Sequence, residues 1–205
     1  MSIERVIERC IEVGINCVNI ADHDEVEGGL RMQRIAPFRV IASEEILTPH
    51  GEIMGMFLTE RIPSGISPEE AIKRIKEQGG LVCIPHPYDR ARCAALERGF
   101  PKELIPEVDI IEIFNSRATR FAGWDKAKLT AQEYGLVPSA GSDAHTPGEI
   151  GRAYVEMPEF TSKEDFCSAL AQGKVYGRRS SMWVHIPSTV TRVRKRVTGR
   201  GRRRR

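Results

Sequence analysis

Four groups of acidic and histidine side chains stand where they could act together in chemistry. Each group follows an apolar run of the chain: Asp22-His23, Glu44-Glu45, His86 and Asp143-Ala144-His145. Carboxylate oxygens and imidazole nitrogens are the usual protein ligands of zinc, manganese and iron. The types and placement of these residues therefore predict a metal centre.

The apolar runs before these groups read as buried strands, each ending where its polar group begins. They cover residues 15–21, 38–42, 81–85 and 137–141. Helical patterns alternate with them, and we expect the run at 52–59 to pair with the strand before it. This order predicts an α/β fold with a mainly parallel sheet, either open or closed into a barrel. Because such folds gather polar residues at the carboxyl ends of their strands, the four groups should meet.

Each group has a simpler interpretation when it is taken alone. Asp143 could cap a polar turn, His86 between two prolines could be a structural histidine, and Glu44-Glu45 could lie in a solvated loop. The joint pattern decides in favour of metal binding, because four groups of ligand type at four predicted strand ends are hard to produce by chance.

Composition narrows the class of protein. The chain has 205 residues, a net charge of +3 and five scattered cysteines without a C-x-x-C motif, which is typical of a reducing cytoplasm. It has no apolar stretch long enough to span a membrane and no signal peptide. Nine basic and no acidic residues fall within 192–205, so this segment is a candidate for non-specific contact with nucleic acid.

The ordered motifs resemble those of the polymerase and histidinol phosphatase (PHP) domain family. The resemblance rests on the segments at 21–23, 43–46, 84–87 and 141–145, with support from 51–53 and 111–117. It covers roughly residues 1–180, which we interpret as one PHP-like domain followed by a basic tail at 181–205. Each motif alone would be weak, but the ordered set is specific.

The resemblance implies a distorted (β/α)7 barrel that holds two or three divalent metal ions (Mn, Zn, Fe or Mg). It implies that Glu45 bridges two metals and that the other ligands are His23, His86, Asp143 and His145. Asn115 and Arg117 match a segment near the substrate, where an arginine could clamp an anion. We expect Glu45, Asp143 and Arg117 to be the catalytic residues.

Two departures from the family pattern stand out. The family begins with a strand ending in His-x-His, whereas this chain contains no His-x-His and starts at the following helix. We therefore expect a barrel that is incomplete at its N-terminus and lacks two or three ligands. Second, Met54 stands where many members carry a histidine after the Glu45 strand, and the role of nearby Glu52 is open.

The function implied is hydrolysis of a phosphate ester by metal-activated water. The substrate would be a small phosphorylated metabolite, a nucleotide or a nucleic-acid end. The alternative is a truncated, catalytically impaired PHP remnant that binds nucleic acid non-specifically through its arginine-rich tail.

Overall fold

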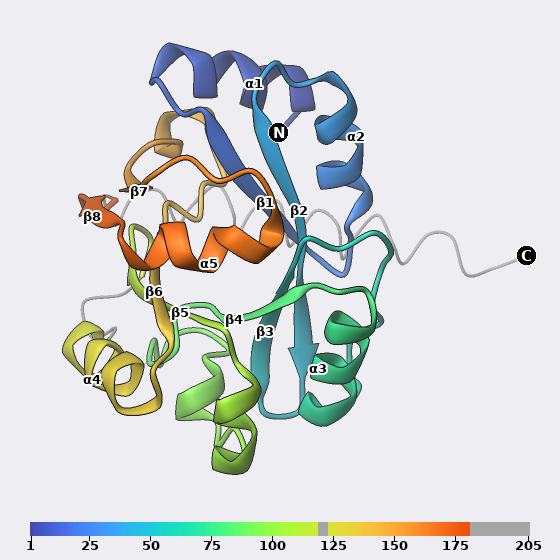
Figure 1. The fold of residues 1–205 in the computed structure, drawn as a ribbon, viewed down its shortest axis with the longest axis vertical. Coiled ribbons are helices and arrows are strands. Elements are labelled where there is room, and N and C mark those ends of the chain that lie inside the picture. Colours follow the sequence, from blue (N-terminus) through green and yellow to red (C-terminus); the bar gives the residue numbers. More distant parts are fainter. Residues whose placement is uncertain (119–122, 181–205) are drawn as a thin grey trace, which may run out of the picture.

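The computed structural model describes residues 1–118 and 123–180, so the predicted tail at 181–205 lies outside the described residues. Within them the chain alternates helices and strands (Figure 1). The α-helices are α1 (Ile3–Glu12), α2 (Glu27–Ile35), α3 (Pro68–Glu77), α4 (Trp124–Tyr134) and α5 (Lys163–Ala171). The strands are β1 (Cys17–His23), β2 (Arg39–Thr48), β3 (Gly51–Met56), β4 (Leu81–Ile84), β5 (Ile110–Asn115), β6 (Val137–Gly141), β7 (Ala153–Glu156) and β8 (Lys174–Gly177). Short 3-10 turns lie at Ala95–Glu97, Lys102–Glu107 and Pro147–Glu149.

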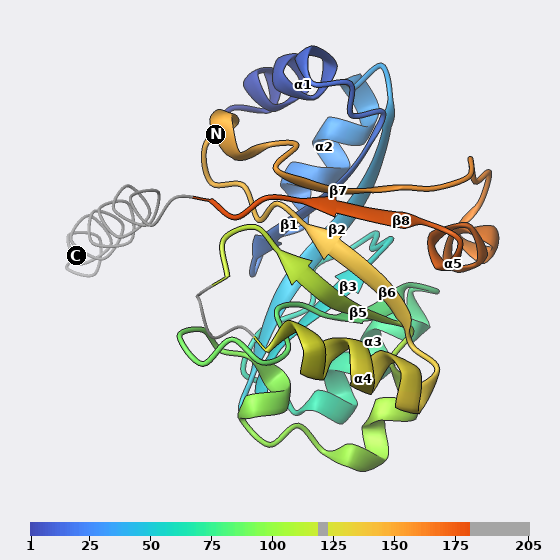
Figure 2. The same ribbon diagram turned by 90° about the vertical axis from the view of Figure 1, so that its left-hand side faces the viewer.

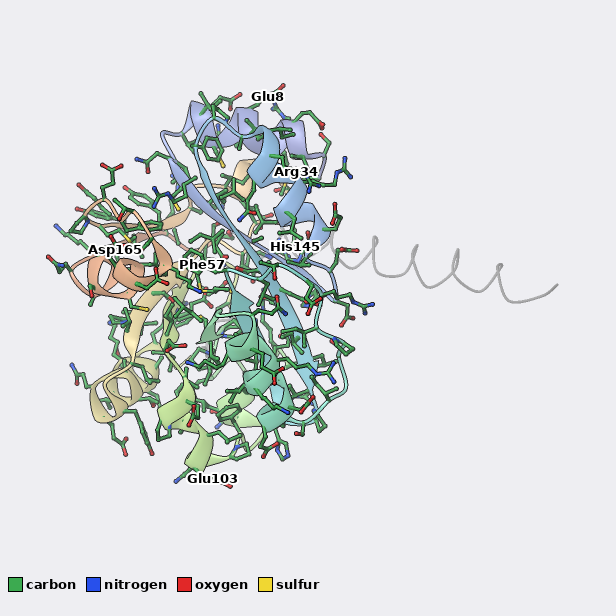
Figure 3. The ribbon with its side chains drawn as sticks, turned by 45° about the vertical axis from the view of Figure 1, so that its right-hand side comes forward. Glu8, Arg34, Phe57, Glu103, His145 and Asp165 are labelled. Carbon is green, nitrogen blue, oxygen red and sulfur yellow. The ribbon has the colours of Figure 1, made fainter. Side chains whose placement is uncertain are left out.

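Local signals explain where the helices begin. The side chains of Ser2, Ser67 and Ser162 each accept a hydrogen bond from a backbone N–H three residues later. These caps satisfy donors that have no partner in the first helical turn. Charged side chains such as Glu8, Arg34 and Glu103 point outward (Figure 3).

Six strands form one sheet in the sequential order β1-β2-β3-β4-β5-β6, while β7 and β8 form a separate antiparallel pair. Neighbours in the large sheet are parallel, except that β3 runs antiparallel to both β2 and β4. Figure 2 shows the sheet curled, with β1 and β6 at its edges. The expected α/β class is confirmed in the form of a mixed, half-barrel sheet.

The two faces of the sheet pack against different layers. On the outer face Ala42, Ile53 and Val82 join a core with Ile72 and Ile75 of α3. On the concave face a second core joins Ile41, Met56, Cys83 and Ile110 to residues of α5 and the loop before it. Successive strand residues alternate between these faces. The side chain of a residue such as Glu45 therefore faces the concave side together with Ile41.

The prediction that β2 ends before Glu44-Glu45 is wrong. The strand continues to Thr48, because its second half pairs with β3 from Ser43↔Met56 to Thr48↔Gly51. The expected pairing of these two segments through a turn is confirmed, and Pro49 and His50 form the turn. The two glutamates thus belong to a strand and project from opposite faces.

No helix in the described ranges, 1–118 and 123–180, has the length and apolar character needed to cross a membrane.

Gly51 provides a test of how the β2–β3 hairpin is packed. Its φ is +105°, and a Cβ built there would lie 2.6 Å from Ala95 Cα. We expect Gly51→Ala to lower the free energy of unfolding by roughly 2–4 kcal/mol, since it adds backbone strain and a clash with main-chain atoms. Gly148→Ala is the matched control, because its added Cβ meets nothing within 4 Å. Urea denaturation of both variants measures the difference, and equal stabilities would reject this account.

Candidate metal centre

Three possible ligands from adjacent strands meet at the carboxyl end of β1. His23 and Glu45 are register partners in the parallel β1–β2 pair, and His23 Nδ1 lies 3.3 Å from Glu45 Oε2. The carboxylate of Glu52 on β3 comes within 3.9 Å of the same nitrogen. Ligand atoms of the three residues all lie within 4.8 Å of one another, which is close enough to share a metal ion.

His86 extends this cluster from the loop after β4. Its side chain is 1% exposed, and Nε2 lies 3.4 Å from Glu52 Oε2. Neither ring nitrogen finds a hydrogen-bond partner among the described residues. Burial, followed by the positive charge of Arg92, lowers the pKa of His86 to about 4. The imidazole is therefore neutral and has a lone pair to donate, which is the form that binds metals.

Asp143 and His145 approach from the loop after β6. The Asp143 carboxylate contacts Nη1 of Arg92 and accepts a hydrogen bond of 3.3 Å from Asn115 Nδ2. His145 Nδ1 lies 3.4 Å from Asp143 Oδ1. Burial alone would raise the pKa of Asp143, but the charge and hydrogen bond of Arg92 outweigh it and lower this pKa. Asp143 is thus held as a carboxylate.

Glu112 of β5 connects His86 to Asn115, the residue that donates to Asp143. Its Oε2 accepts hydrogen bonds from the backbone N–H of His86 at 2.7 Å and from Asn115 Nδ2 at 3.0 Å. Burial raises the pKa of Glu112 to about 7. A side chain at position 141 would collide with Glu112 Oε1, so Gly141 permits the close approach of β6.

The backbone is strained at two positions of the cluster. His86 has a φ of +29° and Asp143 a φ of +50°, a region that residues other than glycine rarely adopt. Such conformations persist only where surrounding contacts enforce them. Here the Glu112 carboxylate holds the N–H of His86, and Asn115 and Arg92 hold the side chain of Asp143.

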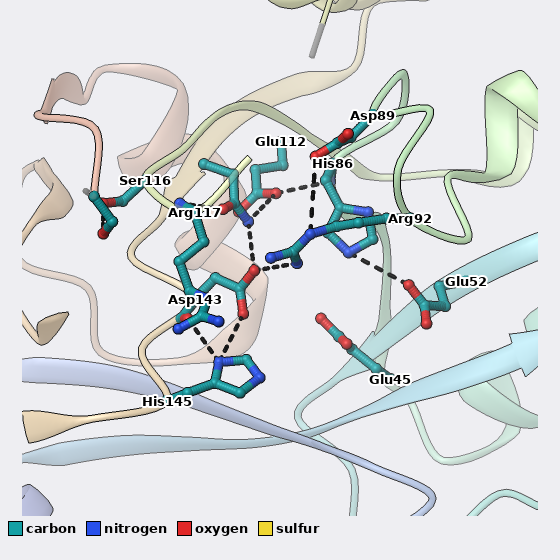
Figure 4. Close-up of polar contacts among 12 residues, drawn as sticks. Glu45, Glu52, His86, Asp89, Arg92, Glu112, Ser116, Arg117, Asp143 and His145 are labelled. Atoms are coloured by element: carbon teal, nitrogen blue, oxygen red, sulfur yellow. Dashed lines mark hydrogen bonds and ion pairs between the residues drawn. The ribbon is translucent and has the colours of Figure 1, made fainter. Parts of the chain in front are cut away.

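Figure 4 shows these carboxylates and imidazoles turned toward one another, with the Arg92 guanidinium among them. Burial raises the pKa of Glu45 well above its ordinary value, and the charges of Asp143, Glu52 and Glu112 raise it further. Carboxylates crowded in this way gain from binding a cation. The concave face beside them opens into a cavity of about 1790 Å³. The donor set, together with a His86 ring that makes no hydrogen bond within the described part of the chain, therefore fits divalent metal ions.

Glu44, the neighbour of Glu45, belongs to the opposite side of the sheet. It is fully buried, and its Oε2 accepts a hydrogen bond of 2.8 Å from the N–H of Ile62. Of the two glutamates, Glu45 is therefore the one that faces the cluster.

Arg117, which we expect from the sequence to clamp a substrate, forms a buried ion pair with Glu149 in the structure. Its side chain is 2% exposed, and Nη1 lies 2.6 Å from Glu149 Oε1. The other oxygen of Glu149 accepts hydrogen bonds from the N–H groups of His145 and Thr146, at 3.1 and 2.9 Å. The geometry therefore favours a positioning role for Arg117, which holds the loop that carries Asp143 and His145.

Three residues of the cluster were not assigned to it by sequence reasoning. No motif in the sequence points to Arg92, and the motifs leave the role of Glu52 open beside Met54, which lies opposite Glu45 in the hairpin. The alternation of β3 puts Glu52 and Met54 on one face, so the hairpin register could have included Glu52. Glu112 carries a signal as well, because it is a charged residue inside an apolar strand.

Comparison with known proteins gives both family and fold matches. Residues 124–175, from α4 to β8, match the PHP-associated family. An uncharacterized protein of Methanocaldococcus jannaschii is 37% identical over 140 residues, which is 63% of this chain and 59% of the relative. A second uncharacterized protein of that organism is 43% identical over 106 residues, which is 50% of this chain and 60% of the relative. The chain thus spans less than two thirds of either curated relative.

Solved structures share the fold at low sequence identity. A two-domain protein of Bacteroides vulgatus, described as containing a predicted PHP-like metal-dependent phosphoesterase, has a TM-score of 0.68 and 16% identity, with 87% of this chain and 60% of that chain covered. PsfC of Pseudomonas syringae has a TM-score of 0.64 and 16% identity over 93% and 88%. A candidate metal-dependent phosphoesterase of Bifidobacterium adolescentis has a TM-score of 0.59 and 15% identity over 84% and 91%.

The buried Arg117–Glu149 pair can be tested separately from metal binding. We expect Arg117→Met to lower the free energy of unfolding by about 3–5 kcal/mol, because it leaves the Glu149 carboxylate buried without its counter-charge. Arg34→Met, which removes an exposed partner of Glu27, should leave the urea midpoint unchanged. A midpoint for Arg117→Met equal to that of the parent would contradict the positioning role.

Proposed function

The chain is a member of the PHP family, and from this premise we propose that it hydrolyses phosphate esters with the help of divalent metal ions. The observation that carries the proposal is the buried His86, whose ring nitrogens make no hydrogen bond to any described residue and lie beside a group of carboxylates. A buried imidazole without a hydrogen bond is costly, and a cation at this place would remove the cost.

We assign six side chains as metal ligands. Five are those that the family resemblance implies, and Glu52 joins them because of its contacts with His23 and His86. The six are His23, Glu45, Glu52, His86, Asp143 and His145. Such a set of carboxylates and imidazoles suits two or three ions of Mn, Zn, Fe or Mg.

Bound divalent cations would supply hydroxide near neutral pH and neutralise phosphoryl oxygens. The residues of this chain would bind the cations and hold the ligand side chains in position. Glu45 and Asp143 contribute the negative charge that would hold the cations, and Glu45 faces the cavity from β2. Asn115 and Glu112 fix Asp143 and the backbone of His86 in place. The ion pair between Arg117 and Glu149 holds the loop that carries Asp143 and His145, because Glu149 also accepts a hydrogen bond from the N–H of His145.

The substrate we propose is a small phosphorylated metabolite, a nucleotide or a nucleic-acid end in the cytoplasm. The cavity beside the cluster is large enough for a molecule of that size. We also propose that the curled sheet corresponds to the greater part of a distorted (β/α)7 barrel, in line with the family resemblance.

Substitution of Asp143 tests the enzymatic proposal. Asp143→Asn keeps the size of the side chain but removes a negative charge, so we expect Mn²⁺ affinity and phosphatase activity to fall by at least about a hundredfold. Asp125→Asn is the control, since the Asp125 side chain is fully exposed and pairs only loosely with Lys128. Calorimetry with Mn²⁺ and a screen of phosphate esters provide the two readouts. Retained activity in Asp143→Asn would refute the assignment.

The basic segment at 192–205 is proposed to contact nucleic-acid phosphates without sequence preference. We expect DNA affinity to fall steeply as salt rises and to be lost when residues 192–205 are deleted. Fluorescence anisotropy with a labelled duplex measures both effects. A deletion variant that binds DNA as the full chain does would exclude this role.

A further inference from the structure

Arg92 brings a positive charge into the predicted metal site. It belongs to the loop between β4 and the 3-10 turn at Ala95–Glu97, six residues after His86. Nη1 contacts Asp143 Oδ2, Nε lies 3.8 Å from Asp89 Oδ2, and the side chain is only 21% exposed. Figure 4 shows the guanidinium lying between Asp143 on one side and Glu45 and Glu52 on the other.

The charge of Arg92 acts on several proposed ligands at once. Its positive charge attracts the carboxylates of Asp143, Glu112 and Glu45. A single fixed cation therefore offsets part of the repulsion among the carboxylates.

We propose that Arg92 is the internal counter-ion of the metal-free site, and that it must release Asp143 before a divalent cation can bind there. The inference rests on the function proposed above. It assigns to Arg92 the control of metal affinity, a role that neither the family motifs nor the comparisons give it.

The geometry at Asp143 makes the two cations competitors. Its Oδ2 faces the guanidinium of Arg92 and also accepts the N–H of Asn115. A divalent ion on the same oxygen would lie close to the positive guanidinium inside a partly buried site, where charges repel more strongly than in water. Arg92 must therefore move away from this oxygen when the ion arrives.

Asp89 gives the released guanidinium a nearby anionic partner. This residue is fully buried and already lies 3.8 Å from Nε of Arg92. The N–H of Ala91 donates to Asp89 Oδ1 at 3.1 Å, which helps to keep the carboxylate in place. A shift of the guanidinium toward Asp89 would clear Asp143 while the arginine stays paired, so the exchange needs only a local movement.

The test compares Arg92→Gln with a matched change in the same loop, Arg90→Gln. Arg90 is 79% exposed and pairs with Glu97, away from the cluster. We expect Arg92→Gln to bind Mn²⁺ about tenfold more tightly than the parent, because no ion pair has to be broken first. Without metal, it should melt at a lower temperature than the parent, since the carboxylates lose their counter-ion. Arg90→Gln should change neither quantity. Calorimetry with Mn²⁺ and thermal denaturation in EDTA provide the measurements.

The outcomes separate this inference from the proposed function. If the parent binds Mn²⁺ and Arg92→Gln binds it equally or less tightly, the counter-ion role is overturned and the metal site stands. If neither binds Mn²⁺, both proposals fail. Should Arg92→Gln not fold, Arg92→Lys decides. It keeps the charge but lacks the planar fork that reaches two carboxylates, so its Mn²⁺ affinity should exceed that of the parent. An affinity no higher than that of the parent would again overturn the role.

Discussion

Repulsion among buried carboxylates is the constraint on which this structure depends. Glu45, Glu52, Glu112 and Asp143 face one another at one end of a sheet whose concave face is otherwise largely apolar. Taking a carboxylate out of water costs free energy, and a like charge nearby adds to that cost. The fold offsets the cost with donors such as Asn115, with the guanidinium of Arg92 and, in the function proposed here, with metal ions. The hydrogen bonds and ion pairs around the site thus reduce the free-energy cost of burying several carboxylates together.

The supporting contacts also show how rigidity is distributed. The strained backbone of His86 and of Asp143 lies in loops. A hydrogen bond to Glu112 of β5 holds the first loop, and the Arg117–Glu149 pair holds the second. The placement of the clustered side chains thus depends on the residues packed around them. Arg117, which the family motif predicts to lie near the substrate, pairs with Glu149 in the structure, since a motif gives the position of a residue but not its side-chain partner.

Much of the fold could be predicted from the sequence because its signals are local. Serine caps mark three helices, and β4 and β6 are short apolar runs that end close to where the pattern predicts. The parallel arrangement then brings His23, His86 and Asp143 to one end of the sheet. What could not be predicted depends on pairing between distant segments. The extension of β2 through Glu44-Glu45 needs β3 as a partner, and Glu52 enters the cluster only through that pairing.

The β2–β3 hairpin has one more consequence. Glu45 and Glu52 approach from opposite arms of this hairpin, and the pairing Thr48↔Gly51 sets how far apart they stand. Side chains in a strand alternate, so shifting one arm by a single residue would carry its glutamate to the opposite face of the sheet. Evolution can vary the turn's residue types more freely than its length, and insertions in related chains should be rare there although a surface turn usually tolerates them.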